Sequence, residues 1–347
     1  MPSKKNILLS IFSLLLGWLL VWLILRFTNV EITEILARFY NLNLWYTILA
    51  IASLFLHFWF TAYKWNLVTQ KLTPERKQPL RFYLFYTTLG TFTMQFMPQY
   101  VGMVVVQNLA LRVHKISSFS RGFLSVIYDQ FFNFLIPVLL VPASVLFVLG
   151  YLPLSLAVFF TTTVIILTHF IIKKWHKLLI QSLIKGYWKI KSIKNKQQLS
   201  SKEIISDYPL FGRNFTLKLF WISVIRYVFW LIRGILIVLA GGFKIKLWAI
   251  VFITPIVQLA MLLSFTPANL GLMELSWIGL LGLFQVPSIE AIEFALLQRL
   301  LYILATGITL GGFFLIWLFE SYFKSKSKVS IAREKNSSAS NNFIRNK

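Results

Sequence analysis

Six stretches of this chain are each long enough and apolar enough to cross a membrane as a helix. They cover residues 7–25, 44–62, 120–149, 153–172, 216–240 and 291–319. The bilayer core offers no water to backbone polar groups, so such stretches satisfy those groups as helices. Only 13% of the residues are charged, against about a quarter in soluble domains. The sequence therefore predicts an all-α polytopic membrane protein with six full spans.

Basic residues are concentrated in alternate connections between these spans. The formal net charge is +24, and the positive-inside rule then places both termini in the cytoplasm, with the spans in the cytoplasmic (inner) membrane. The same charges predict contact with anionic lipid headgroups rather than with nucleic acid. The chain has no cysteine, which excludes disulfides, thiolate metal sites and cysteine nucleophiles.

Two further apolar stretches are interrupted in the middle. The first, 82–111, contains Pro98 and Gly102, and the second, 247–286, contains the segment 267–271, with Pro267, Asn269 and Gly271. Proline removes a backbone donor and glycine permits unusual φ, so both segments predict a helix break. A break at membrane depth requires protein or a wet cavity around it. We predict two re-entrant hairpins, which gives eight elements; two tilted full spans in each stretch are the alternative.

The two breaks share the pattern Pro-x-x-x-Gly and are separated by 169 residues (267 − 98). The same offset relates Lys64 to Arg233, and the pair Asp129-Gln130 to Gln298-Arg299. This predicts an inverted repeat with a binding site near the bilayer midplane, although a chance match of prolines and glycines is the alternative. We divide the chain into half-repeats 1–150 and 151–320 and a disordered basic tail at 321–347. The second half-repeat contains a basic cytoplasmic loop at 173–213, whose first half is either an amphipathic helix on the inner leaflet or a plain loop.

Charged residues within the membrane are costly, so each is a candidate for substrate binding or translocation. We select Glu274, Arg299, Asp129, Arg233, Lys64 and Arg112. Glu274 follows the second break, where it either binds substrate or caps a half-helix, and Arg299 is a candidate partner for it. Asp129 needs a cationic partner, for which Arg112, Arg226 and Arg233 are candidates. Arg233 alternatively extends to the outer interface.

No motif for a metal, a cofactor or covalent catalysis stands out in the sequence. The four histidines are scattered, and neither a nucleophile-elbow motif nor a phosphate-binding loop is present. We therefore predict no catalytic residues, no metal and no cofactor, and a protein that is not an enzyme.

Short motifs in both halves resemble one family. They are Thr266 to Glu274, Gly282 and Gln298-Arg299 in the second half, and Lys64-Trp65, Phe96 to Pro98, Gly102 and Tyr128-Asp129 in the first. Together they resemble the lysylphosphatidylglycerol synthase transmembrane-region family. Two positions depart from its pattern: Ala268 and Asn269 replace small glycines, and Gln130 stands where an arginine commonly follows the acidic residue.

The resemblance implies a flippase-type membrane domain. We expect translocation of an aminoacylated or anionic phospholipid, or of a polyprenyl-phosphate-linked carrier, by movement of two inverted halves. Two alternatives remain: a non-catalytic membrane partner of a glycosyltransferase or lipid-modifying enzyme, held through the 173–213 loop, and a membrane-embedded transferase.

Overall fold

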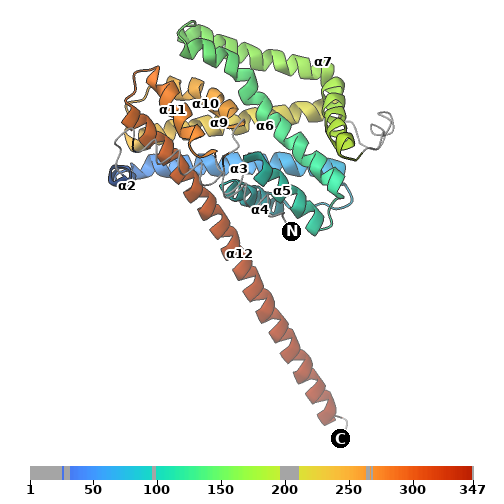
Figure 1. The fold of residues 1–347 in the computed structure, drawn as a ribbon. Coiled ribbons are helices and arrows are strands. Elements are labelled where there is room, and N and C mark those ends of the chain that lie inside the picture. Colours follow the sequence, from blue (N-terminus) through green and yellow to red (C-terminus); the bar gives the residue numbers. More distant parts are fainter. Residues whose placement is uncertain are drawn as a thin grey trace.

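The computed structural model describes residues 32–95, 99–195, 211–262 and 269–345, with Arg26 and Thr266 as isolated positions. All regular secondary structure in these residues is helical (Figure 1). The helices are α2 (Ile32–Tyr40), α3 (Leu44–Leu72), α4 (Leu80–Thr93), α5 (Gln99–Val113), α6 (Phe119–Val148), α7 (Leu154–Asn195), α9 (Arg213–Gly241), α10 (Leu247–Leu262), α11 (Leu272–Gly282) and α12 (Ser288–Arg345).

Five helices are long and apolar enough to cross a membrane, and they correspond to five of the six predicted spans. The spanning parts are Leu44–Leu72, Arg121–Val148, Leu154–Leu178, Arg213–Gly241 and Ser288–Leu318. The sixth predicted span, 7–25, lies outside the described residues. In α7 large apolar side chains such as Phe159 and Phe170 are exposed, as expected for a helix at the edge of a bundle in lipid. The prediction of a polytopic all-α membrane protein is confirmed.

Both interrupted stretches form pairs of short helices, α4 with α5 and α10 with α11, and each pair packs together. With 14 and 15 residues, α4 and α5 are only about 21–23 Å long, and α11 is shorter still, against a hydrocarbon core about 30 Å thick. Hairpins therefore fit better than tilted full spans. Pro98 and Pro267 themselves lie outside the described residues.

The element bounds repeat with the offset read from the sequence. Shifting α3 by 169 residues gives 213–241, the bounds of α9, and shifting the start of α6 gives the start of α12. The ends of α4 and α5 likewise shift onto the ends of α10 and α11. The repeat thus extends over four described helices in each half, which excludes chance similarity of two proline motifs.

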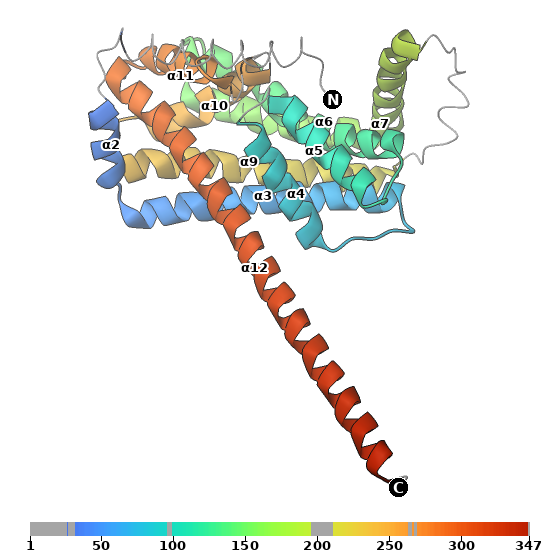
Figure 2. The ribbon, with the colours of Figure 1, turned by 60° about the horizontal axis from the view of Figure 1, so that its bottom comes forward.

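The equivalent helices α3 and α9 lie side by side and run antiparallel (Figure 2). Ser53 donates to the carbonyl of Phe229, His57 contacts Arg226, and Lys64 donates to Ser223. Residue numbers thus rise along one helix as they fall along the other, so the two halves have inverted topology. Among the described helices α7 has no counterpart, and its crossing is what reverses the second half.

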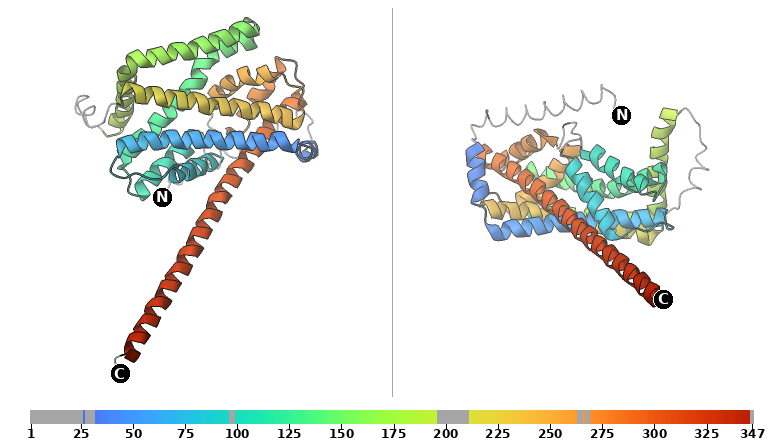
Figure 3. Two further views of the ribbon diagram at one scale, coloured as in Figure 1. Left: turned by 180° about the vertical axis from the view of Figure 1, so that it is seen from behind. Right: turned by 90° about the horizontal axis from the view of Figure 1, so that it is seen from below.

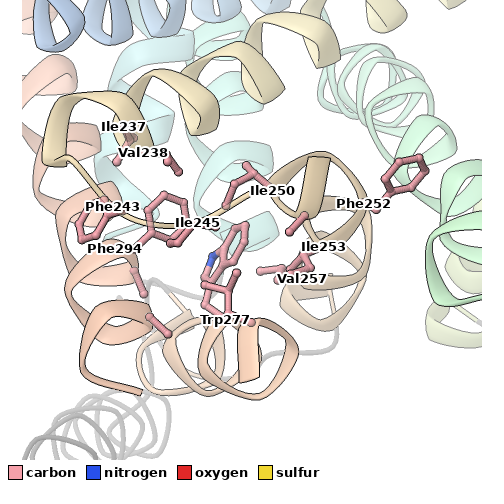
Figure 4. Close-up of a cluster of buried hydrophobic side chains, with 14 of the residues drawn as sticks. Ile237, Val238, Phe243, Ile245, Ile250, Phe252, Ile253, Val257, Trp277 and Phe294 are labelled. Carbon is pink, nitrogen blue, oxygen red and sulfur yellow. The ribbon is translucent and has the colours of Figure 1, made fainter. Parts of the chain in front are cut away.

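Each half packs its broken helix against the other half. The helix α10 packs against α6, and its equivalent α4 packs against α12, around the central pair α3 and α9 (Figure 3). The largest apolar cluster lies around α10, α11 and α12 (Figure 4). In it Trp277 of α11 packs edge-on against Phe294 of α12, with ring centroids 5.0 Å apart. This contact fixes the second broken hairpin on the last helix.

Both α7 and α12 continue as helices beyond the predicted spans, which agrees with the helical alternative for the 173–213 loop and differs from the expected tail. The helix α7 continues to Asn195 with a kink at Trp175, so the first part of the predicted loop is helical, while 196–210 lies outside the described residues. The helix α12 continues to Arg345 and extends beyond the bundle (Figure 1), where we expected disorder. The predicted tail, residues 321–347, contains neither glycine nor proline, so no residue that strongly disfavours a helix interrupts it.

The close approach of α5 to the end of α4 yields a first prediction. A Cβ atom on Gly102 would lie 3.1 Å from the backbone nitrogen and 3.2 Å from the Cα of Met94. Because backbone cannot move aside cheaply, Gly102→Ala is expected to lower the free energy of unfolding by about 1–3 kcal/mol. Denaturation in mixed micelles with sodium dodecyl sulfate measures this change in the free energy of unfolding. The matched control is Gly279→Ala in α11, where nothing lies within 4 Å and the change should be neutral or stabilising.

Candidate functional site

Two neighbouring cavities lie between the two halves, and we name each after its arginine. The empty space at the Arg226 cavity is about 760 Å³ and that at the Arg233 cavity about 610 Å³, open solvent included. Polar residues of the first are His57, Thr61, Thr87, Thr91, Gln130, Asn133, Arg226, Gln258 and Tyr302. Those of the second are Gln95, Arg233, Thr254, Gln258, Asn269, Gln298, Arg299 and Tyr302.

The wall between the cavities is built from both halves. Met94, Trp230, Gln258, Met261 and Tyr302 line both cavities. Met94 caps the end of α4 and Met261 lies in the last turn of α10, so each broken helix ends at this wall. Methionine side chains are flexible and adapt their packing readily. The two breaks therefore converge on the partition between the two cavities.

Arg226 is held at the point where the two halves meet. It donates to Nε2 of His57 at 3.2 Å and to the carbonyl of Asn133 at 3.3 Å, while His57 Nδ1 lies 3.1 Å from the carbonyl of Arg226. A carbonyl accepts only, so these contacts fit the neutral His57 tautomer with a proton on Nδ1. His57 and Arg226 are also equivalents in the repeat, being 169 residues apart. Equivalents touch only near a two-fold axis, so the Arg226 cavity lies at the pseudo-axis.

Arg233 is buried in the second cavity with only 5% of its surface exposed. Its guanidinium lies 3.9 Å from the ring centroid of Trp230, and it donates to Oε1 of Gln298 at 2.8 Å. Arg226, Trp230 and Arg233 are spaced four and three residues apart on α9 and so share one face. The alternative that Arg233 extends to the outer interface is wrong, because its side chain is enclosed by α12.

Lys64 and Asp129 form a fully buried ion pair, with Lys64 Nζ 3.4 Å from Oδ1 of Asp129 and both side chains 0% exposed. Lys64 also donates to the Asp129 carbonyl, to Asn133 and to Ser223. Lys64 is thus the ion-pair partner of Asp129, for which only arginines are candidates in the sequence analysis. The two residues are 65 positions apart in the chain and meet because α3 packs against α6. Neither residue lines a cavity, but Asn133, which both contact, lines the Arg226 cavity.

Glu274 both caps a helix and forms an ion pair. Its Oε2 accepts from the backbone N–H of Gly271 at 2.9 Å, and its Oε1 lies 2.9 Å from Nε and 2.6 Å from an outer nitrogen of Arg299. The helix cap considered for Glu274 and its anticipated pairing with Arg299 are thus both found, and its role in substrate binding stays a prediction. Arg299 lines the Arg233 cavity, whereas Glu274 lies behind it. The positive end of α11 is therefore occupied by the chain's own carboxylate.

The remaining candidates at the breaks have different environments. Asn269 is buried, lines the Arg233 cavity and has φ of +57°, and Gly271 has φ of +81°. Asparagine tolerates the left-handed region better than most residues, which accounts for its presence where the related motif has glycine. Gly102 packs against Met94. Arg112 is exposed at the end of α5 and lines neither cavity.

The hydrogen bonds inside the two halves are themselves repeated. Lys64 contacts Asp129, and Arg233 contacts Gln298, each across 65 residues. Sequence reasoning did not select His57, Trp230, Gln258 or Tyr302, and named Arg226 only as a partner for Asp129. The offset of 169 residues between His57 and Arg226 is the signal that could have found both. Within the described residues no three His, Asp or Glu side chains are grouped to hold a metal ion.

One family model matches nearly the whole membrane region. The model of the lysylphosphatidylglycerol synthase TM region matches residues 10–311. The chain belongs to this family. No curated protein matches the chain by sequence. The matched region includes both broken hairpins, both cavities and the two ion pairs, so the site described above lies within the family's membrane region. The family assignment agrees with the motif resemblance and supports a lipid-related function in the membrane.

Proposed function

We propose that this protein translocates a lipid across the cytoplasmic membrane, as a transporter rather than an enzyme. The observation that carries the proposal is the pair of adjoining cavities at the pseudo-axis, lined by arginines and amides and separated by the ends of both broken helices. Guanidinium groups bind phosphate through two parallel hydrogen bonds, and inverted repeats commonly move against each other around such a midplane site.

The candidate cargo is an aminoacylated or anionic phospholipid, or a polyprenyl-phosphate-linked carrier. The headgroup would occupy the cavities while the acyl or prenyl chains remain in the bilayer. Among the described lining residues none is acidic, so the cavities lack a carboxylate for general acid–base chemistry. With no nucleotide-binding motif in the sequence, movement is passive or ion-coupled. The distribution of basic residues supports a topology with both termini in the cytoplasm.

Transbilayer movement of labelled lipids in vesicles tests the proposal. Vesicles with the purified protein are expected to expose labelled lipid of one class to an external quencher faster than protein-free vesicles. Retention of the protein in the membrane, and its monodispersity after re-extraction, control for damage. If folded protein moves none of the three lipid classes, autonomous translocation is wrong, and a membrane partner of a glycosyltransferase or lipid-modifying enzyme becomes the better hypothesis.

A further inference from the structure

We propose that the two cavities select a lipid headgroup carrying phosphate and no ammonium group, binding it in turn beside Arg226 and beside Arg233. This inference rests on the proposed lipid translocation and narrows its cargo: an aminoacylated, cationic headgroup is excluded.

The charges around the cavities favour an anion. Among the described residues, Arg226, Lys64 and Asp129 at the Arg226 cavity sum to one positive charge, and Arg233, Arg299 and Glu274 at the Arg233 cavity do the same. In each cavity the carboxylate lies behind the lining while an arginine lies in it. Weakly screened charges at this depth interact strongly with a headgroup.

The two aromatic side chains that line both cavities, Trp230 and Tyr302, already face a guanidinium. Cationic headgroups are typically bound over open aromatic faces or beside carboxylates. Trp230 already carries the Arg233 guanidinium at 3.9 Å from its ring centroid, and the Tyr302 ring lies 5.8 Å from the same guanidinium. An ammonium group bound over either ring would be repelled by the positive charge of Arg233. The remaining polar lining, with Thr91, Asn133, Asn269 and Gln258 among it, supplies hydroxyl and amide groups that can bind phosphate oxygens.

The spacing on α9 separates the two binding positions by about 10 Å along the helix, at ~1.5 Å per residue over the seven residues from Arg226 to Arg233. Trp230 lies between them on the same face, with Met94 and Met261 in the wall. Because those methionines sit at the ends of α4 and α10, a movement of either broken helix would open the wall. A headgroup could then pass from one arginine to the other without entering hydrocarbon.

Binding of short-chain lipids to the purified full-length protein in zwitterionic micelles tests the selectivity. Dioctanoyl phosphatidylglycerol is expected to displace its own fluorescent analogue at least about tenfold more effectively than its lysyl ester, since each charge-assisted hydrogen bond contributes enough for a tenfold change. Inorganic phosphate is the second competitor. If it displaces the analogue as well as the lipid does, the cavities bind free phosphate and the headgroup assignment is overturned.

Three variants locate the binding. Arg226→Gln and Arg233→Gln are each expected to weaken phosphatidylglycerol binding by about tenfold or more. The matched control is Arg213→Gln, the same substitution at an exposed position on the same helix, which should bind as the wild type does. Equal loss in all three variants would overturn the assignment, because it would reflect overall charge and not the cavities.

Gln258→Glu is a gain-of-function variant that keeps both arginines. It introduces a carboxylate of the same size into the wall shared by both cavities, so binding is expected to shift from phosphatidylglycerol toward its lysyl ester. An unchanged preference in a folded Gln258→Glu protein would contradict the proposal. Selective binding without movement of the lipid in vesicles would leave this ligand class standing and refute translocation, which separates the two proposals.

Discussion

Replacing Lys64 by methionine is expected to lower the free energy of unfolding by about 3–5 kcal/mol, the usual cost of removing one partner of a buried ion pair. Methionine fills a similar volume but leaves the Asp129 carboxylate, at 0% exposure, without its ion-pair partner. The variant also loses the hydrogen bonds to Asn133 and Ser223, which join three helices. Denaturation in mixed micelles, followed by circular dichroism, measures the change.

Two comparison variants separate the ion pair from general effects of the substitution. Lys71→Met removes the same charge from an exposed position on α3 and should change stability by less than about 0.5 kcal/mol. The double variant Lys64→Met/Asp129→Leu removes both charges and should recover most of the loss, since an apolar pair of similar volume replaces a buried ion pair at little cost. A single Lys64→Met variant as stable as the wild type would show that Asp129 is neutral in the folded protein.

The fold was largely predictable because its main determinants are local. Apolar length identified five described spans, and the prolines with nearby glycines located both breaks. The 169-residue offset was visible from Pro98 and Pro267, and the structure extends it to whole helices. The helical C-terminal tail was not predicted, because a polar composition alone does not distinguish disorder from an isolated helix.

The site was less predictable, since it depends on which helices pack together. The Glu274–Arg299 pair was anticipated because the candidates for a partner near the second break were few. Lys64 was not assigned to Asp129, because nothing in the sequence states that α3 packs on α6. His57 and Arg226 meet only because the pseudo-axis passes between them, and a repeat read from sequence gives the equivalence of two residues without their distance.

Glu274→Gln is expected to reduce lipid translocation by at least about tenfold, the effect of losing one charge-assisted interaction, while the protein still inserts into the membrane. Glutamine at this position can still accept from the Gly271 N–H, because Glu and Gln serve equally in a helix cap. What it cannot do is neutralise Arg299, whose Nε and outer nitrogen both lie within 3 Å of the carboxylate. The vesicle assay, with wild type and variant reconstituted at equal density, measures the rate.

The companion variants determine which role of Glu274 matters. Glu274→Ala loses the cap and the ion pair together, so it should be less stable than Glu274→Gln by about 1 kcal/mol, the typical value of a helix cap. The double variant Glu274→Gln/Arg299→Gln also removes the cation that Glu274 neutralised and should be more stable than Glu274→Gln without regaining transport, because Arg299 lines the Arg233 cavity. If Glu274→Gln transports lipid as the wild type does, the carboxylate is only a cap, and the orientation of Arg299 does not depend on it.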